Sequence, residues 1–262
     1  MAKANRYYIP GEGRASGVRD LFASIAHRYD LINDLQSLGL HRWWKGRLIR
    51  WAGVRPGEEA LDLCCGTGDI AFRLADEGAR VTAVDFSEAM LAVARKRAEG
   101  GAGRGGDRVR FEQGDALGLA HGAGRFDLVT MAYGLRNLGS LDGGLAEMAR
   151  VTRAGGRVLI LDFGKPRVGW WRWLYFLHLR TVVPLLGRWL CGDTDSHGYI
   201  LESLRRYPEG EEVARRMEGV GWERVEWWNL LGGVMTVHRG WRALPPGEGG
   251  ETEGTGEGRG GG

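Results

Sequence analysis

The sequence predicts an α/β protein built on a doubly wound, Rossmann-like sheet, mostly parallel, with an antiparallel edge strand. Three observations lead to this prediction. A short apolar run that begins at Glu59 breaks at two glycines, Gly66 and Gly68, and resumes as a helical pattern. Further apolar runs then alternate with helical patterns, as in βαβ units. Two short strand-like runs follow the last helical segment.

Length and composition indicate one globular domain. The 262 residues are 43% hydrophobic and 26% charged, which is ordinary for a soluble protein with a sizeable core. The net charge of +3 comes without a dense Lys/Arg run, so nucleic acid is not a predicted partner. Three cysteines make no disulfide framework and fit a reducing compartment. We find neither a signal peptide nor an apolar run long enough to span a membrane, so we expect a cytoplasmic protein that is at most peripheral to the membrane.

The ends of the chain differ from its middle. Residues 1–17 are predicted to be a flexible arm, and residues 18–242 a single domain that starts with a helical cap at 18–55. Within the cap, residues 29–34 interrupt the helical pattern. Nine glycines among the sixteen residues from Gly247 leave nothing to build a core, so 243–262 is predicted to be a disordered Gly/Glu tail.

The sheet is assembled from short runs with clear boundaries. Ser87 is expected to be the N-cap of the helix after the second strand. A glycine pair at 155–156 is expected to form the turn into the fifth strand. After the run at Glu59, the predicted strands are residues 80–86, 109–113, 126–131, 157–163, 223–227 and 233–237, and later helices are expected near 145–151 and 209–217.

An aromatic-rich insertion follows the fifth strand, at residues 165–206. It is longer than a crossover requires, and Pro184 is expected to break its helix. One interpretation is a buried helix whose aromatic side chains pack on the sheet. The other is a lid or interfacial segment, in which tryptophans and arginines of residues 167–191 contact a membrane headgroup layer.

Acidic residues lie within or just after each of the first three strands. Asp62 lies inside the first strand, where a buried carboxylate needs a partner, while Asp85 ends the second strand and Asp115 follows the third. This arrangement resembles the S-adenosylmethionine (SAM) site of the Rossmann-like, class I methyltransferases. The resemblance implies that Asp62 holds the methionine ammonium, Asp85 the ribose and Asp115 the adenine amino group. The remaining expected cofactor contacts are Gly66, Thr67, Gly68, Phe86 and Ala116. No metal site is predicted.

Several stretches together resemble one family, the menaquinone/ubiquinone biosynthesis C-methyltransferases of the demethylmenaquinone methyltransferase type. The stretches are residues 22–34, 39–45, 62–69, 134–137, 163–166 and 229–240, and they span nearly all of the folded part. Gly-Leu-Arg-Asn at 134–137 and the final Gly-Gly…His-Arg-Gly are the most specific. The resemblance implies methyl transfer from SAM to a ring carbon of a prenylated quinol. The reduced ring is nucleophilic, so the oxidised quinone is expected not to react.

Three residues are the catalytic candidates. We expect Arg136 to stabilise the phenolate charge and Asn137 to orient the substrate, unless both only fix their loop through an Arg–carboxylate pair. Tyr29, in the cap, is expected to cover the methionine end of the cofactor or the quinol, or else to pack a helix end. The histidines at 27, 178, 197 and 238 are all conceivable bases, and the sequence selects none of them.

Some features depart from the family pattern and leave alternatives open. His27, Ala132 and the aromatic content of 167–198 differ from what relatives often carry. An NAD-linked oxidoreductase shares the glycine turn and Asp85, but the cap and Asp115 disfavour it. An O-methyltransferase acting on another hydrophobic small molecule, or a non-catalytic scaffold in a quinone-synthesis complex, stays possible from sequence. The sequence also leaves open whether the substrate is a naphthoquinol or a benzoquinol, how long its prenyl tail is and whether the protein forms a homodimer.

Overall fold

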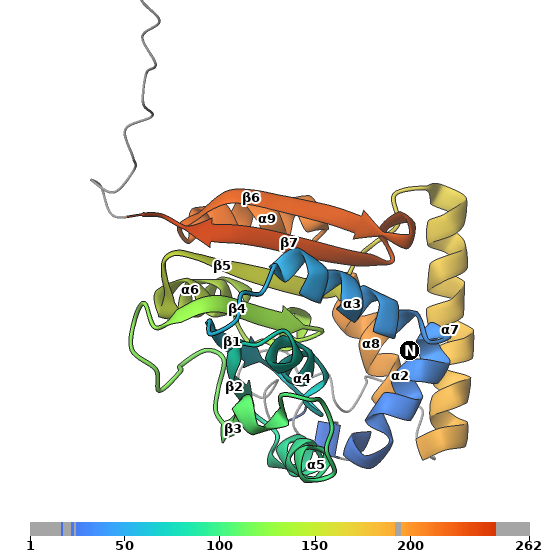
Figure 1. Ribbon diagram of the computed structural model, residues 1–262. Helices are drawn as coiled ribbons and strands as arrows, with labels where there is room; N and C mark the ends of the chain where they lie inside the picture. The colour runs from blue at the N-terminus through green and yellow to red at the C-terminus, as the bar shows by residue number, and fades with distance from the viewer. Residues whose placement is uncertain (1–16, 18–21, 24, 192–194, 245–262) are drawn as a thin grey trace, which may run out of the picture.

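The computed structural model describes residue 17, residues 22–23, 25–191 and 195–244, and Figure 1 shows their arrangement. The arm predicted at 1–17 and the tail predicted at 243–262 lie almost entirely outside these residues. The described chain forms a seven-stranded, mostly parallel sheet with helices on both faces, which confirms the predicted fold class.

The strand order is β3-β2-β1-β4-β5-β7-β6. The strands are β1 (Glu59–Leu63), β2 (Arg80–Asp85), β3 (Val109–Gln113), β4 (Phe126–Ala132), β5 (Thr152–Phe163), β6 (Trp222–Leu230) and β7 (Met235–Arg242). Strands β1 to β5 are parallel, and β7 runs antiparallel to both β5 and β6. The order reverses beside β1, and such switch points are where open α/β sheets bind ligands.

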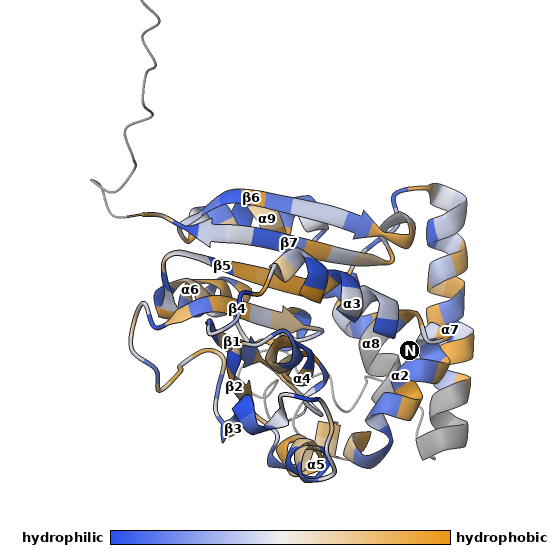
Figure 2. Ribbon diagram, viewed as in Figure 1, coloured by the Kyte–Doolittle hydropathy of each residue, from blue (hydrophilic) through white to orange (hydrophobic). Residues whose placement is uncertain are grey.

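Helices cover the two faces of the sheet unequally. Helices α3, α4 and α5 lie over one face, and α6 and α9 over the other (Figure 1). The helices are α2 (Tyr29–Ser37), α3 (Leu40–Ala52), α4 (Asp69–Asp76), α5 (Glu88–Glu99), α6 (Leu141–Val151), α7 (Gly169–Cys191), α8 (Asp195–Arg206) and α9 (Gly210–Gly219). β5 is strongly hydrophobic (Figure 2), and its residues 158–161 are buried in the resulting core.

Two predicted interruptions of helices are wrong. Residues 29–34 belong to α2, and the break comes later, where Leu38 and Gly39 both have positive φ, 51° and 76°. Pro184 lies inside α7, which continues past it. A proline removes a single amide donor, and packing of α7 against α2 and α8 compensates for the lost hydrogen bond.

Other boundaries differ by a few residues. β5 starts at Thr152 rather than at 157, because the glycine pair makes an irregularity within the strand, with Gly155 at φ 70°, instead of a turn before it. Ser87 is at the N-cap position of α5, but its hydroxyl makes no capping bond. β6 extends beyond its predicted run at both ends, whereas β7 starts at Met235 rather than at 233 and continues to Arg242, because it pairs with both β5 and β6 up to there.

Part of the insertion after β5 packs on the core, as the first interpretation predicts, and part of its apolar surface is exposed. Helix α7 stands beside the ends of the strands, next to α2 and α8 (Figure 1). Tyr175, Leu179 and Val183 are buried against the core. Trp170 and Trp173 on the same helix are 70% and 66% exposed, so α7 carries both a packed face and an uncovered apolar face.

Candidate active site

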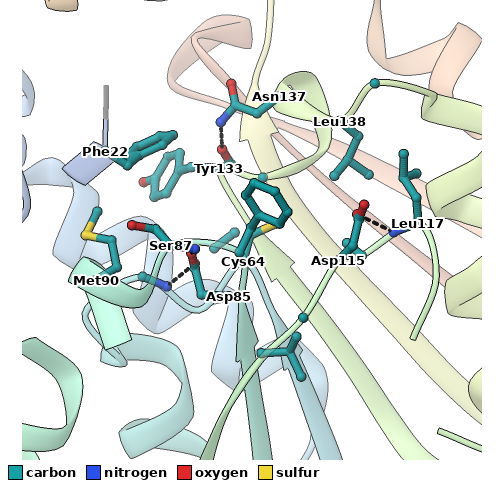
Figure 3. Close-up of a pocket in the computed structure, with 18 of the residues that line it drawn as sticks. Phe22, Cys64, Asp85, Ser87, Met90, Asp115, Leu117, Tyr133, Asn137 and Leu138 are labelled. Atoms are coloured by element: carbon teal, nitrogen blue, oxygen red, sulfur yellow. Dashed lines mark hydrogen bonds between the residues drawn. The ribbon is translucent and has the colours of Figure 1, made fainter. Parts of the chain in front are cut away.

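A cavity of about 460 Å³ opens at the carboxyl ends of β1, β2 and β4. Five of the expected cofactor residues line it, together with Tyr29 and Asn137. The five are Gly66, Asp85, Phe86, Asp115 and Ala116. Figure 3 shows Phe22, Ser87 and Met90 on one side and Asp115, Leu117 and Leu138 on the other, with Asp85 between them. We call this the first cavity.

The turn after β1 shapes one wall of the first cavity. Gly66 has a φ of 55°, and its amide donates to Asp85 Oδ2 at 2.8 Å. Gly68 has a φ of 85°, and a Cβ there would lie 2.9 Å from the Phe72 ring. Gly68 lines no described cavity, so its contribution is to the turn and to helix packing. Thr67 faces a smaller cavity described below.

Asp85 and Asp115 are both fixed by the backbone. Asp85 Oδ1 accepts from the Ser87 amide at 2.8 Å, and Asp115 Oδ1 accepts from the Leu117 amide at 2.9 Å (Figure 3). Burial raises the pKa of Asp85, although the amides of Ser87 and Gly66 favour its charged form. Both carboxylates therefore hold fixed orientations at the cavity wall, where they can accept hydrogen bonds from ligand hydroxyl or amino groups.

Asp62 lies at a small cavity of about 30 Å³ behind the glycine turn. Its side chain is buried in β1, and Oδ1 accepts from Thr130 Oγ1 at 2.8 Å. Oδ2 has no partner among the described residues. Burial raises the pKa of Asp62 to about 7, even though Thr130 and Lys45 favour the carboxylate. A buried carboxylate with a free oxygen is costly, so the site favours a bound cation.

A charged network joins the cap to the glycine turn. Arg97 of α5 donates to Asp30 Oδ2 at 3.2 Å, to the Thr67 carbonyl at 2.8 Å and to Asp69 Oδ1 at 2.8 Å. Lys45 Nζ of α3 donates to Asp69 Oδ2 at 2.9 Å. Burial alone would raise the pKa of Asp69, but Lys45 and Arg97 hold it well below its ordinary value. Sequence reasoning found neither cation.

A second cavity of about 430 Å³ lies between α2, α3 and α7. It shares Phe22, Tyr29 and Tyr133 with the first cavity, so the two adjoin. Its lining is mostly apolar. The remaining residues of the wall include Ile25, Ile32, Leu40, Trp44, Phe163, Trp171, Leu174, Leu179, Val183, Leu231 and Val234, with Asn33, Gln36, Ser37, His41, Arg136, Tyr175 and His178 as polar members.

The catalytic candidates are distributed over both cavities. Tyr29 lines both, Asn137 lines the first and Arg136 the second. Arg136 is buried and pairs with Asp162, whose Oδ1 accepts from Nη1 at 3.0 Å. Arg136 Nη1 and Asn137 Nδ2 also donate to the carbonyl of Tyr133, at 2.6 and 3.0 Å. The Arg–carboxylate pair considered from sequence is therefore present, and it fixes the guanidinium at the cavity wall.

Histidines contribute little to the first cavity. His238 donates from Nε2 to the Gly210 carbonyl at 2.8 Å, and burial lowers its pKa to about 4. His178 and His41 line the second cavity. Within the described residues, no group of three or more His, Cys, Asp or Glu side chains is arranged to hold a metal.

The comparisons with known proteins agree with this architecture. The sequence profile of the ubiE/COQ5 methyltransferase family matches residues 11–242. The "Ubiquinone/menaquinone biosynthesis C-methyltransferase UbiE" of Paracoccus denitrificans strain Pd 1222 is 42% identical over 236 residues, covering 89% of this chain and 94% of the relative. The protein of the same name from Azotobacter vinelandii strain DJ is 40% identical, covering 88% and 92%.

Solved structures share the fold at low sequence identity. The [4+2]-cyclase SpnF superposes with a TM-score of 0.65 at 15% identity, covering 91% of this chain and 98% of that one. The phosphoethanolamine N-methyltransferase 2 of Haemonchus contortus, solved in complex with SAM, gives 0.61 at 17% identity, covering 93% and 61%. The profile match and the long alignments at about 40% identity show more than a shared fold: the chain belongs to the ubiE/COQ5 methyltransferase family.

Proposed function

We propose that this protein transfers the methyl group of SAM to a ring carbon of a prenylated quinol, as in conversion of demethylmenaquinol to menaquinol or of the equivalent ubiquinone precursor. The observation that carries the proposal is the pair of adjoining cavities. The first has acids and glycines at the sheet's switch point, the second is apolar, and both meet at Tyr29 and Tyr133.

The residues of the first cavity and of the small cavity beside Asp62 together fit SAM. The free Oδ2 of Asp62 would accept from the methionine ammonium, Asp85 from the ribose hydroxyls and Asp115 from the adenine amino group. Phe86 and Ala116 would pack against the base, while Gly66 and Thr67 leave room for the methionine part. When bound, SAM supplies an electrophilic methyl group that needs alignment with the acceptor carbon and exclusion of water.

The second cavity fits an apolar ring with polar substituents. A quinol carbon becomes more nucleophilic as its neighbouring hydroxyl loses its proton, so the site has to stabilise negative charge on that oxygen. Arg136 brings positive charge to this wall, partly balanced by Asp162. Tyr29 lines both cavities and would shield the passage between them. Asn137 would hold the loop after β4 in place through its hydrogen bond to the Tyr133 carbonyl.

The prenyl tail of the substrate suggests a membrane contact around the second cavity. Leu38, Trp170, Trp173 and Leu185 are each more than 60% exposed, and Leu174 and Leu231 of the cavity wall are also exposed. In the described part of the chain no helix is both long and apolar enough to cross a bilayer. We therefore propose peripheral contact through residues 167–191, with Trp and Arg at the headgroup level. Failure of the intact protein to float with anionic liposomes would exclude it.

Product analysis tests the proposed reaction. The protein is incubated with SAM and a demethylnaphthoquinol that bears a short prenyl tail, and the extracted product is analysed by mass spectrometry and NMR. We expect the product to gain one methyl group on a ring carbon. A methyl group on oxygen would indicate an O-methyltransferase instead, and SAM binding without any product would indicate a scaffold.

A further inference from the structure

We propose that Tyr133 is a further catalytic residue whose hydroxyl donates a hydrogen bond to the reacting oxygen of the quinol. The inference rests on the proposed function and adds to it a contact that neither the sequence motifs nor the family comparison assigned. Three observations carry it: the position of the side chain, its unsatisfied hydroxyl and the way its backbone is held.

Tyr133 stands where the cavities meet. It lines the first cavity, the second cavity and the small cavity beside Asp62. Among the residues that the structure describes, only Tyr29 shares all three walls. A group at this junction lies between the cofactor's place and the apolar pocket, which is where the acceptor carbon and its neighbouring oxygen have to be.

The hydroxyl of Tyr133 is buried and has no hydrogen-bond partner in the described part of the chain. A buried donor without a partner costs free energy, and a ligand oxygen removes that cost. Burial also raises the pKa of the phenol well above its ordinary value, so it stays protonated and remains a donor at neutral pH. It can therefore stabilise negative charge on a bound oxygen, whereas it is unsuited to take up a proton.

The backbone of Tyr133 is held in an unfavourable conformation. Its φ is 61°, in the left-handed region that non-glycine residues rarely adopt. Three hydrogen bonds maintain it: its amide donates to the Leu161 carbonyl at 2.7 Å, and its carbonyl accepts from Arg136 and Asn137. The two catalytic candidates from the sequence thus fix the peptide that places this ring, and Arg136 and Asn137 act in part as positioning residues for Tyr133.

The rest of the second cavity matches a ligand with acceptor oxygens. Further buried donors without partners among the described residues belong to residues that line it, namely Gln36 Nε2, Trp44 Nε1 and Tyr175 Oη. Tyr133 is the one of these that also reaches the first cavity, which assigns it to the reacting end of the ring. A second ring oxygen would then lie toward the donors deeper in the pocket.

Tyr133→Phe tests the proposal because phenylalanine keeps the ring and removes only the hydroxyl. The matched control is Tyr207→Phe, since the Tyr207 hydroxyl is also buried and lacks a described partner but lines neither large cavity. Methyl transfer to the reduced quinol is measured across pH, and SAM affinity by calorimetry.

For Tyr133→Phe we expect kcat to fall on the order of 100-fold, as when one donor to a developing oxyanion is lost, with the SAM Kd within about twofold of wild type. The acid limb of the kcat profile should move up by about one pH unit, because the phenolate is less stabilised. Tyr207→Phe should match wild type in all three measurements. The proposed role of Tyr133 is overturned if Tyr133→Phe keeps the wild-type kcat and pH profile. It is also overturned if the variant loses only SAM affinity.

The wild-type enzyme separates this inference from the proposed function. If wild type makes no methylated quinol, the proposed function fails, and ligand binding then tests Tyr133 by itself. The probe is a short-chain naphthoquinone, titrated by tryptophan quenching into protein loaded with S-adenosylhomocysteine. A Kd about three- to tenfold weaker in Tyr133→Phe than in Tyr207→Phe supports the contact, and equal values refute it.

Discussion

Arg136 and Asp162 form an ion pair inside the fold, with the side chains 5% and 0% exposed. Asp162 Oδ1 accepts from Arg136 Nη1 and from the Phe163 amide, while Oδ2 accepts from the Arg136 amide. The carboxylate thereby fixes both the backbone and the guanidinium of Arg136. This geometry positions a cation at the wall of the second cavity and, through the Tyr133 carbonyl, the turn after β4.

Replacing Arg136 by lysine keeps the charge but loses the planar group that reaches Asp162 and Tyr133 together. We expect kcat for quinol methylation to fall by roughly 10- to 100-fold while the SAM Kd stays near wild type, because Arg136 lines the second cavity. Steady-state kinetics and calorimetry measure the two effects. The control is Arg216→Lys, an exposed arginine with carboxylate partners. Unchanged turnover in Arg136→Lys would retire the proposed role.

Asp62 is expected to control cofactor binding. Asp62→Asn removes the negative charge that we propose for binding the methionine ammonium, so calorimetry should show a SAM Kd at least about tenfold weaker. Wild-type affinity should also strengthen as pH rises from 6 toward 7, because the pKa of Asp62 in the free protein is about 7 and the charged form binds the cation. This pH dependence should vanish in Asp62→Asn. Its persistence would exclude Asp62 as the titrating group.

The same carboxyl group lowers the stability of the free protein. Its folded pKa of about 7 lies above the ordinary value of 3.8, so the folded state holds the proton between these limits. The contribution of Asp62 to the free energy of unfolding is therefore complete below about pH 4. It decreases as the pH rises to about 7, by up to roughly 4 kcal/mol in total. At pH 8 without SAM, Asp62→Asn should melt higher than wild type. A lower Tm would contradict this account.

Arg97 is expected to couple the cap to the cofactor turn. Arg97→Gln loses most of its bonds to Asp30, Thr67 and Asp69, so we expect a melting temperature several degrees lower and SAM binding about three- to tenfold weaker. Arg95→Gln is the matched control, because Arg95 is on the same helix and, within the described residues, its ion-pair partner is the exposed Glu88. Equal effects in the two variants would show that the network does not support the site.

His238 should make the fold sensitive to acid. Its folded pKa of about 4 lies below the ordinary value of 6.5, so between these values the unfolded chain binds the extra proton. The stability contributed by neutral His238 is thus complete above pH 6.5 and falls, by up to about 3 kcal/mol, as pH drops to 4. Denaturant unfolding at pH 5 and 7 should show a smaller pH dependence for His238→Gln. An identical dependence in both proteins would contradict the assignment.

The parts of the fold that sequence predicts well are those with local causes. Local sequence patterns predict the strand β1, the glycines that follow it and the acids after the next strands. The parallel sheet then brings Asp62, Asp85 and Asp115 to one edge. Gly68 is a partial exception, because its requirement comes from the Phe72 ring beside it rather than from a ligand.

The second cavity depends on packing between distant segments and could not be predicted from local patterns. Its walls come from the cap, the turn after β4 and α7, and the contact of α2 with α7 creates it. The position of Tyr133 could not be predicted from the sequence, because tyrosine rarely adopts a left-handed backbone conformation. Its positive φ is maintained by hydrogen bonds from Arg136 and Asn137 and to Leu161. The predicted helix break at Pro184 was wrong for the same reason, because tertiary contacts maintain a helix that local preference would end.

The most direct test of the account is label transfer from radiolabelled SAM to a demethylnaphthoquinol with a short prenyl tail, with and without dithionite. Carbon methylation requires an electron-rich ring, so label should enter the organic phase only under reducing conditions. Equal labelling with the oxidised quinone and no reductant would contradict the quinol mechanism. So would the absence of label in both conditions from protein that binds SAM normally.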